Sequence, residues 1–334
     1  MPTLGDLRRE AVLHAEMVLA DLELDLGVRV PIFDVIEDQS IWLSFEPLKN
    51  LLGVYQRVGE AAGIAVHAGH PLALQRFTAA HELGHHLLGH RSSFDDRNAI
   101  ENPSDDPQEM QAQTFAASLL MSEDAVEAVL ERRGLNTTNP RLSPLDVYLM
   151  SAELGVSFKA TVTQLRVLNR IAPTEANDLY RLSALALKRQ VLGGRRPDNP
   201  RASVWRLDIA DNHRRLTVDV GDELDFALPE MRSTGYEWVP STEHESHFAV
   251  VSDRYERADA GSDEVVFGSS GTRHLTFKAV RAGVCEVNLV LEQPWEGGDS
   301  SATYTVNATV APPPVSEVGR GIAVNQQPQL LLAS

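Results

Sequence analysis

The sequence predicts an α+β multidomain protein, in which a mixed part is followed by an all-β part. Two observations support this division. Up to about residue 190 apolar residues recur mainly at helical spacing, whereas from residue 205 to 310 they alternate in short runs. Between the two patterns, residues 192–200 are rich in glycine, proline and charge and lack either period. We therefore expect a mixed domain, a linker and a β-sandwich.

The composition limits the kinds of protein to which the chain can belong. Its 334 residues and 43% hydrophobic content suffice for two or three domains with real cores. A net charge of -17 argues against general binding to nucleic acid or to anionic membranes. A single cysteine, Cys285, fits a reducing compartment, and no apolar stretch approaches the roughly 18 residues of a membrane span. We expect a cytoplasmic location.

An amphipathic helix is predicted within residues 1–27, because charged residues such as Arg8 and Glu16 interrupt the apolar pattern in a way that signal peptides do not. Short apolar runs follow at 28–33, 41–45, 54–55 and 64–66. These runs predict a small sheet. Its edge could receive an extended substrate peptide by strand addition, and a purely structural sheet is the alternative.

The most informative stretch is His81-Glu-Leu-Gly-His85, within a predicted helix between Pro71 and Gly89. On a helix, His81 and His85 lie one turn apart on one face, so both imidazoles can bind one metal ion. Glu82 points elsewhere, which suits a general base acting on a water molecule that zinc has activated. The alternative is a helix with histidines on a solvated face.

The third ligand must come from further along the chain. A second class of zinc proteases carries glycine and histidine three and six residues after the second ligand. Leu88 and Arg91 occupy those positions here, so His90 is out of register for that class.

A second helix is predicted to begin with an Asp106 cap and Pro107. Glu109 falls on its apolar face, where a carboxylate is costly unless it is paired or bound to metal. Glu109 is therefore a candidate third ligand, although a capping box with the residue 106 amide also explains its position. The apolar face comprises Ala112, Phe115, Ala116, Leu119 and Leu120.

These two helices together resemble the ImmA/IrrE family of zinc metallopeptidases over roughly residues 1–170. The resemblance is carried by Gln75-Arg-Phe-Thr and Leu-Leu-Gly-His around the first motif, and by Glu109 with its apolar face. The chain departs from the family at Gln111-Ala-Gln113, where Glu-Ala-Asn is common, so the residues that support the ligands differ.

The resemblance implies a zincin-like fold with Zn²⁺ held by His81, His85 and Glu109, and with Glu82 as the catalytic glutamate. Known members cleave or regulate DNA-binding repressors, so it also implies a specific intracellular protein substrate. The residue that stabilises the oxyanion is not assigned, and its candidates are His86, His90 and Tyr148.

Residues 126–190 are predicted to be helical. Gly155 ends one helix and Ser157 caps the next, a pattern that resembles a helix-turn-helix. The segment from Lys159 to Arg201 contains nine Lys or Arg residues and three Asp or Glu residues, whereas the whole chain is acidic. Plain packing of a helical hairpin is the favoured interpretation, and the reversal of charge leaves contact with DNA as the alternative.

The second part predicts an immunoglobulin-like β-sandwich over residues 204–312. Cys285 lies in strand context, so a packed thiol is favoured over a nucleophile. The alternating runs are 205–209, 216–220, 224–226, 275–279, 287–291 and 304–310.

Three loops of this part combine glycines with the aromatic residues Tyr236, Trp238 and Trp295, which can serve as rigid anchors at an interface. In order, the loops resemble those that chagasin-type inhibitors present to papain-like cysteine peptidases. The candidate partner-binding residues are Ser233, Thr234, Gly235 and Tyr236 in the first loop, Gly268 and Gly271 in the second, and Pro294 and Trp295 in the third.

Departures from that family lie at Met231-Arg232, where Asn-Pro is usual, and at Gln293, where arginine is usual. The first replacement removes the rigidity that a proline gives the loop, and the second removes a positive charge. An immunoglobulin-like spacer with the aromatic residues in its core is the alternative.

The predicted domains are a zinc metallopeptidase (1–125), a helical segment (126–190), a linker (191–203), a chagasin-like sandwich (204–312) and a disordered tail (313–334). The resulting hypothesis is a zinc endopeptidase whose sandwich recognises or inhibits a partner. The alternative is an inhibitor of cysteine peptidases whose metal domain is regulatory or vestigial.

Overall fold

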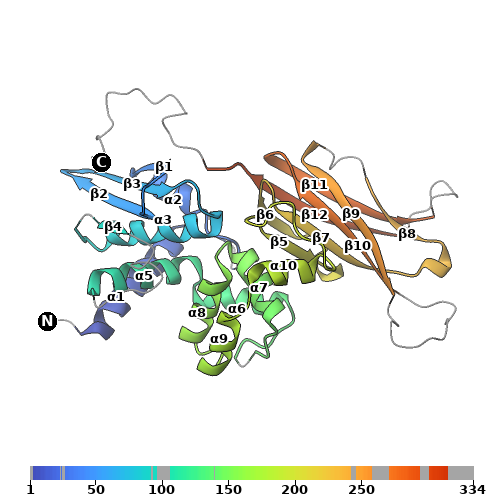
Figure 1. The fold of residues 1–334 in the computed structure, drawn as a ribbon, viewed down its shortest axis with the longest axis horizontal. Helices are drawn as coiled ribbons and strands as arrows, with labels where there is room; N and C mark the ends of the chain where they lie inside the picture. The colour runs from blue at the N-terminus through green and yellow to red at the C-terminus, as the bar shows by residue number, and fades with distance from the viewer. Residues whose placement is uncertain are drawn as a thin grey trace. The chain divides into compact units, whose positions relative to one another are not determined.

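The computed structural model describes residues 3–22, 24, 27–91, 93–95, 106–138, 140–241, 246–257, 271–293 and 301–314. The chain divides into two compact units, the first extending to Leu182 and the second covering Ser183–Pro313 (Figure 1). No helix among the described residues combines the length and the apolar character that a membrane crossing requires.

The described strands of the first unit form one sheet in the order β1-β3-β2-β4. β1 runs parallel to β3, whereas β2 is antiparallel to both β3 and β4. The strands are β1 (Trp42–Glu46), β2 (Gly53–Val58), β3 (Ala61–His67) and β4 (Ser93–Asp95).

The strand expected at 28–33 is wrong, because residues 28–31 belong to no strand and Ile32–Asp38 forms helix α2. Pro31 immediately precedes this helix, and Ile32, Val35 and Ile36 are buried at helical rather than strand spacing. Strand β4 is not among the runs that the sequence predicts for this sheet.

Helix α3 (Leu72–Leu87), which carries the His-Glu motif, packs against β2 and β3 on one side and against α5 (Pro107–Leu120) on the other. Helix α1 (Leu4–Leu22) packs against α5. A methyl group added at Gly84 would lie 3.2 Å from the Ala112 Cα and 3.0 Å from the Phe115 ring. The glycine therefore allows α3 and α5 to approach closely, which brings the two predicted metal motifs together.

Four more helices complete the described part of the first unit: α6 (Glu123–Arg132), α7 (Pro144–Leu154), α8 (Phe158–Val167) and α9 (Pro173–Tyr180). Gly155 ends α7 in a left-handed conformation with a φ of 68°, and the Ser157 hydroxyl caps α8 by accepting a bond from the Ala160 amide. The turn between α7 and α8 is thus the predicted one. Contact of this pair with DNA stays the untested alternative.

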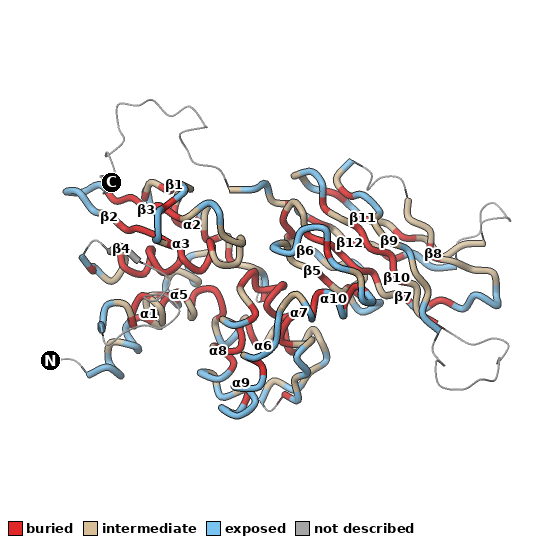
Figure 2. Tube along the Cα trace, viewed as in Figure 1, coloured by how far each residue is buried: buried red, intermediate tan, exposed pale blue. Residues whose placement is uncertain are grey.

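The described strands of the second unit form two sheets, ordered β5-β7-β10-β9 and β6-β12-β11-β8. Their strands carry many buried residues (Figure 2), and these residues form one core. In this core the rings of Phe226 in the first sheet and Tyr304 in the second are in contact, with 5.9 Å between their centroids. Cys285 lies in this core, as a packed thiol would. The elements are helix α10 (Ala184–Val191) and strands β5 (Val204–Leu207), β6 (Arg215–Asp219), β7 (Glu223–Glu230), β8 (Glu237–Pro240), β9 (Phe248–Arg257), β10 (Gly271–Ala279), β11 (Gly283–Glu292) and β12 (Ala302–Ala311).

The segment expected to be a linker is fastened to the second unit by polar contacts. The buried Glu223 carboxylate pairs with Arg195 and accepts a bond from the Asp198 amide at 2.8 Å. Lys188 of α10 donates to the carbonyl oxygen of Ala202 at 2.6 Å. These contacts hold α10 and residues 192–203 against the sandwich.

Candidate metal centre and loop surface

The centre of the first unit brings together two histidines of α3 and one carboxylate of α5. The Nε2 atoms of His81 and His85 lie 3.1 Å apart. The Glu109 carboxylate lies 3.3 Å from the first and 3.5 Å from the second. One ligand atom from each residue lies within 4.8 Å of the others. Two imidazole nitrogens and a carboxylate oxygen form a donor set that zinc accepts, so these residues fit the metal that the sequence predicts.

The side chain that caps the start of α5 is Asp106, and Glu109 is directed to the histidines instead. The Asp106 carboxylate accepts a bond from the Gln108 amide at 2.9 Å. The Glu109 side chain, 14% exposed, is directed to the histidines. Its arrangement therefore favours the ligand interpretation over the capping interpretation.

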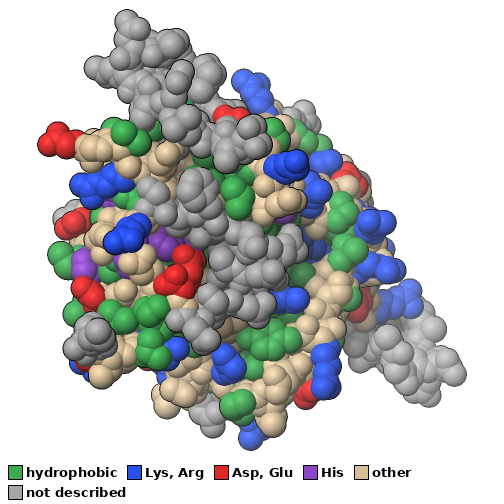
Figure 3. All heavy atoms as spheres, turned by 60° about the vertical axis from the view of Figure 1, so that its left-hand side comes forward, with side chains coloured by type: hydrophobic (Ala, Val, Ile, Leu, Met, Phe, Trp, Pro, Cys, Tyr) green, Lys and Arg blue, Asp and Glu red, His purple; other side chains and the backbone are tan. Residues whose placement is uncertain are grey.

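Histidine side chains also gather on the surface of this unit, where Figure 3 shows several of them close together near an acidic side chain. The candidate ligands themselves are almost fully enclosed, with His81 at 0% and His85 at 1% exposure. Burial of this kind strengthens electrostatic interactions with a bound cation, because little water competes for the ligands.

The predicted general base, Glu82, is also fully buried. It lies against Gly53, the first residue of β2. A methyl group at Gly53 would stand 2.2 Å from the Glu82 Oε1 atom and 2.5 Å from Thr78 Cγ2. Gly53 thus provides the space that the carboxylate occupies. A glycine within a strand can mark close approach to another group, although the sequence alone does not name that group.

The C-terminus of α3 positions a third histidine behind the site. Gly89 adopts a φ of +69°, and the His90 amide then donates to the His85 carbonyl oxygen at 2.9 Å. This ending brings the His90 Nδ1 atom to 3.1 Å from His85 Nδ1, on the side of that ring opposite to Glu109. Burial lowers the pKa of His90, which favours its neutral form.

Gln111 of α5 completes this arrangement. Its Oε1 atom lies 3.2 Å from His90 Nε2, while its Nε2 atom donates to Glu10 at 3.1 Å and to the Leu7 carbonyl oxygen at 3.3 Å. The two acceptors on α1 fix the amide so that its oxygen faces His90. His90 then donates through Nε2 and accepts through Nδ1, so His85 donates through Nδ1 and keeps its Nε2 lone pair for a metal. The sequence drew attention to Gln111 but gave no partner for it.

The other two candidates for stabilising the oxyanion are His86 and Tyr148. His86 places Nδ1 3.2 Å from the Tyr55 hydroxyl of β2, and burial lowers its pKa. Tyr148 is buried in α7. The oxyanion-stabilising residue therefore stays unassigned among the described residues.

In the second unit the first predicted loop forms a short 3₁₀ turn, η2 (Arg232–Thr234), between β7 and β8. Ser233 and Thr234 are exposed, and Gly235 has a φ of 79°. The Gln293 side chain donates to the Thr234 carbonyl oxygen at 2.9 Å, which ties the start of the third loop to the first.

Other candidates of the loop surface have different positions. Gly271 is the first residue of β10, where a methyl group would lie 2.4 Å from the Tyr255 ring. Trp238 is 2% exposed in the sandwich core, so the expectation that it anchors an interface is wrong. Its indole is needed to fill the space between the sheets. Gly268, Pro294 and Trp295 lie outside the described residues.

Comparisons with known proteins match each unit separately. Residues 36–166 match the family model of the IrrE N-terminal-like domain, and residues 217–310 match that of the chagasin family of peptidase inhibitors. Chagasin of Trypanosoma cruzi is 31% identical over 103 residues, which cover 29% of this chain and 89% of chagasin.

Two solved structures are similar to part of the chain. The cysteine protease inhibitor EhICP2 of Entamoeba histolytica is 20% identical, with 34% of this chain and all (100%) of that one covered and a TM-score of 0.30. PbICP-C, solved in complex with falcipain-2, is 14% identical, with 33% and 100% covered and a TM-score of 0.24.

The chain belongs to the chagasin family of peptidase inhibitors through its second unit, and its first unit contains an IrrE-like domain of the metallopeptidase type.

Proposed function

We propose that the first unit is a zinc-dependent endopeptidase. The observation that carries this proposal is the convergence of His81, His85 and Glu109, with a buried glutamate next to the first histidine in the chain. These three residues would hold Zn²⁺, which when bound lowers the pKa of a water molecule and polarises a scissile carbonyl.

The chain's own residues perform the proton transfers. Glu82 accepts the proton of the attacking water and delivers it to the amine that leaves when the peptide bond breaks. Gly53 keeps the space for this carboxylate, and His90 with Gln111 orients the His85 ring. The proposed substrate is a specific intracellular protein, and the relation to IrrE-like domains favours a DNA-binding repressor.

The peptidase activity is tested with a library of proteome-derived peptides, incubated with zinc-loaded protein and read by mass spectrometry. We expect new peptide termini with the wild type and none with Glu82→Gln, which retains all three ligand residues. The same termini from both proteins would contradict the proposed mechanism.

A second candidate function belongs to the second unit, because the chagasin relationship covers most of that inhibitor. We propose that this unit binds papain-like cysteine peptidases through its loops, either to inhibit them or to recruit a partner. The full chain should inhibit papain in an assay with a fluorogenic peptide. An absence of binding at micromolar concentration would leave this unit only a scaffold or substrate-recognition role.

A further inference from the structure

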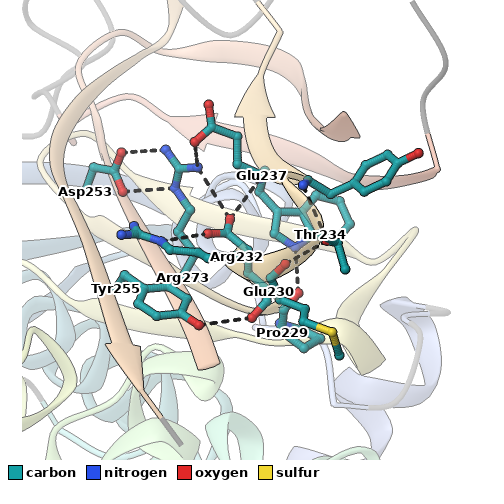
Figure 4. Close-up of polar contacts among 11 residues, drawn as sticks. Pro229, Glu230, Arg232, Thr234, Glu237, Asp253, Tyr255 and Arg273 are labelled. Carbon is teal, nitrogen blue, oxygen red and sulfur yellow. Dashed lines mark hydrogen bonds and ion pairs between the residues drawn. The ribbon is translucent and has the colours of Figure 1, made fainter. Parts of the chain in front are cut away.

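A fully buried carboxylate stands at the base of the first loop of the sandwich. Glu230, the last residue of β7, has 0% side-chain exposure, and its Oε2 atom accepts a bond from the Trp238 amide at 3.0 Å. Its Oε1 atom lies 3.3 Å from Arg232 Nε, and Arg273 Nη1 lies 3.4 Å from Oε2 (Figure 4). A buried carboxylate is tolerated when it is paired and hydrogen-bonded in this way.

These contacts close the loop between two sheets. β7 belongs to one sheet and β8, which contains Trp238, to the other. The bond from the Trp238 amide to Glu230 therefore joins the two ends of the segment 231–237. Two further bonds reinforce the closure: Trp238 Nε1 donates to the Pro229 carbonyl oxygen at 2.9 Å, and the Tyr255 hydroxyl donates to the Glu230 carbonyl oxygen at 3.3 Å.

Arginine side chains hold the carboxylate from two directions. Arg273 of β10 also binds both oxygens of Asp253, at 3.0 and 2.7 Å, and Glu237 at 3.1 Å, so its guanidinium group is fixed by three carboxylates (Figure 4). The Arg232 guanidinium lies 4.0 Å above the centre of the Tyr255 ring. The first residue of η2 is thus held by a charge and by an aromatic face.

The tip of this loop is exposed although its base is fixed. Thr234 donates through its hydroxyl to the Met231 carbonyl oxygen at 2.7 Å, and the Gly235 amide donates to the Arg232 carbonyl oxygen at 3.1 Å. Small polar residues therefore project from a backbone that is already ordered. Such a tip can enter a narrow protein cleft, and a loop ordered before binding loses little entropy on association.

We propose that Glu230 is the positioning residue of this loop, and that it holds residues 232–236 in the conformation that docks into the cleft of a peptidase. The inference rests on the proposed binding function of the second unit. It also assigns a role to Arg232, which stands where proline is usual. A proline would order the loop by its fixed φ, whereas Arg232 orders it by its ion pair with Glu230 and by stacking on the Tyr255 ring.

The test compares the full chain with Glu230→Gln in two measurements. Hydrogen exchange of the amides 233–236 should be at least 10-fold faster in the variant, while the amides of β11 stay protected. The inhibition constant for papain should rise by about 10- to 100-fold, since two or three side chains must then be ordered on binding. Glu256→Gln is the matched control, because Glu256 is 67% exposed and pairs with Arg254 rather than with the loop.

A folded Glu230→Gln protein with wild-type loop exchange and wild-type inhibition would overturn the proposal. If that variant does not fold, Arg232→Gln replaces it. The Arg232 side chain is 58% exposed, so its replacement leaves no cavity in the core. Faster loop exchange and weaker inhibition are expected there as well, and unchanged values would overturn the proposal. A wild type that does not inhibit papain contradicts the proposed binding function instead, while loop exchange still decides whether Glu230 orders the loop.

Discussion

Replacing Gln111 with leucine should weaken zinc binding without touching a ligand. Leucine has a similar size but cannot accept the bond from His90, whose Nε2 atom lies 3.2 Å from the Gln111 oxygen. His90 then loses the contact that selects its tautomer, and His85 loses a fixed acceptor for its Nδ1 proton. A lost partner of a ligating histidine typically costs 10- to 100-fold in metal affinity.

That loss corresponds to about 1.4 to 2.7 kcal/mol of binding free energy, which agrees with the roughly 1–3 kcal/mol cost of leaving one buried polar group unsatisfied. The assay is competition for Zn²⁺ with a chromophoric chelator. Gln108→Leu is the control, because it makes the same substitution at an exposed position of the same helix. Equal zinc affinities for Gln111→Leu and the wild type would refute the proposed chain of contacts behind His85.

Three further predictions concern the general base, its neighbour and a buried acid of the sandwich. Gly53→Ala should keep zinc but lower kcat/KM by about 100-fold in the peptide assay, because a methyl group 2.2 Å from Glu82 Oε1 must displace that carboxylate by roughly 1 Å; unchanged kcat/KM would show that Glu82 does not act there. Glu82→Gln should bind zinc with affinity close to that of the wild type and release no peptide products, and loss of zinc from this variant would instead make Glu82 a ligand. In the second unit, burial and the nearby Asp219 charge raise the pKa of Asp222 to about 6, so its protonation stabilises the folded state, fully below the unfolded pKa of about 3.9, and this contribution is lost as the pH rises through about 6. Chemical denaturation between pH 4 and 7 should show the wild type losing stability relative to Asp222→Asn as the pH rises, and parallel curves would contradict the raised pKa.

The metal motif could be predicted from the sequence because its geometry is local. One helical turn separates His81 from His85, so a helix alone places both on one face, and the structure brings Glu109 to them from the next predicted helix. To predict the Glu109 carboxylate as a ligand, the sequence also had to show that it lies on the buried face of α5. The helical spacing of Glu109 from Phe115 and Ala116 indicated this.

The supporting residues could not be predicted, because each acts through contacts between distant parts of the chain. Gln111 is oriented by α1, about a hundred residues earlier in the chain. Gly53 makes room for Glu82 only because β2 lies against α3. Periodicity also failed at Trp238. A tryptophan in a two-residue alternation can belong to the core or to a loop anchor, and the register of β8 against β11 decides for the core.

The loop of the sandwich gives a third example. Replacement of a rigid Asn-Pro pair by Met231-Arg232 predicts a loss of order from the sequence. The structure compensates through Glu230, Arg273 and Tyr255, which come from three different strands. Order at this loop is therefore a property of the sheet around it.

The most direct test of the metal centre is the zinc content of the purified protein, measured by elemental mass spectrometry beside His85→Ala and Glu109→Ala. We predict one zinc ion per chain in the wild type and its loss in both variants, with the second unit still folded. A wild type that stays free of metal after incubation with zinc would contradict the peptidase proposal and leave the loops of the sandwich as the functional part of the chain.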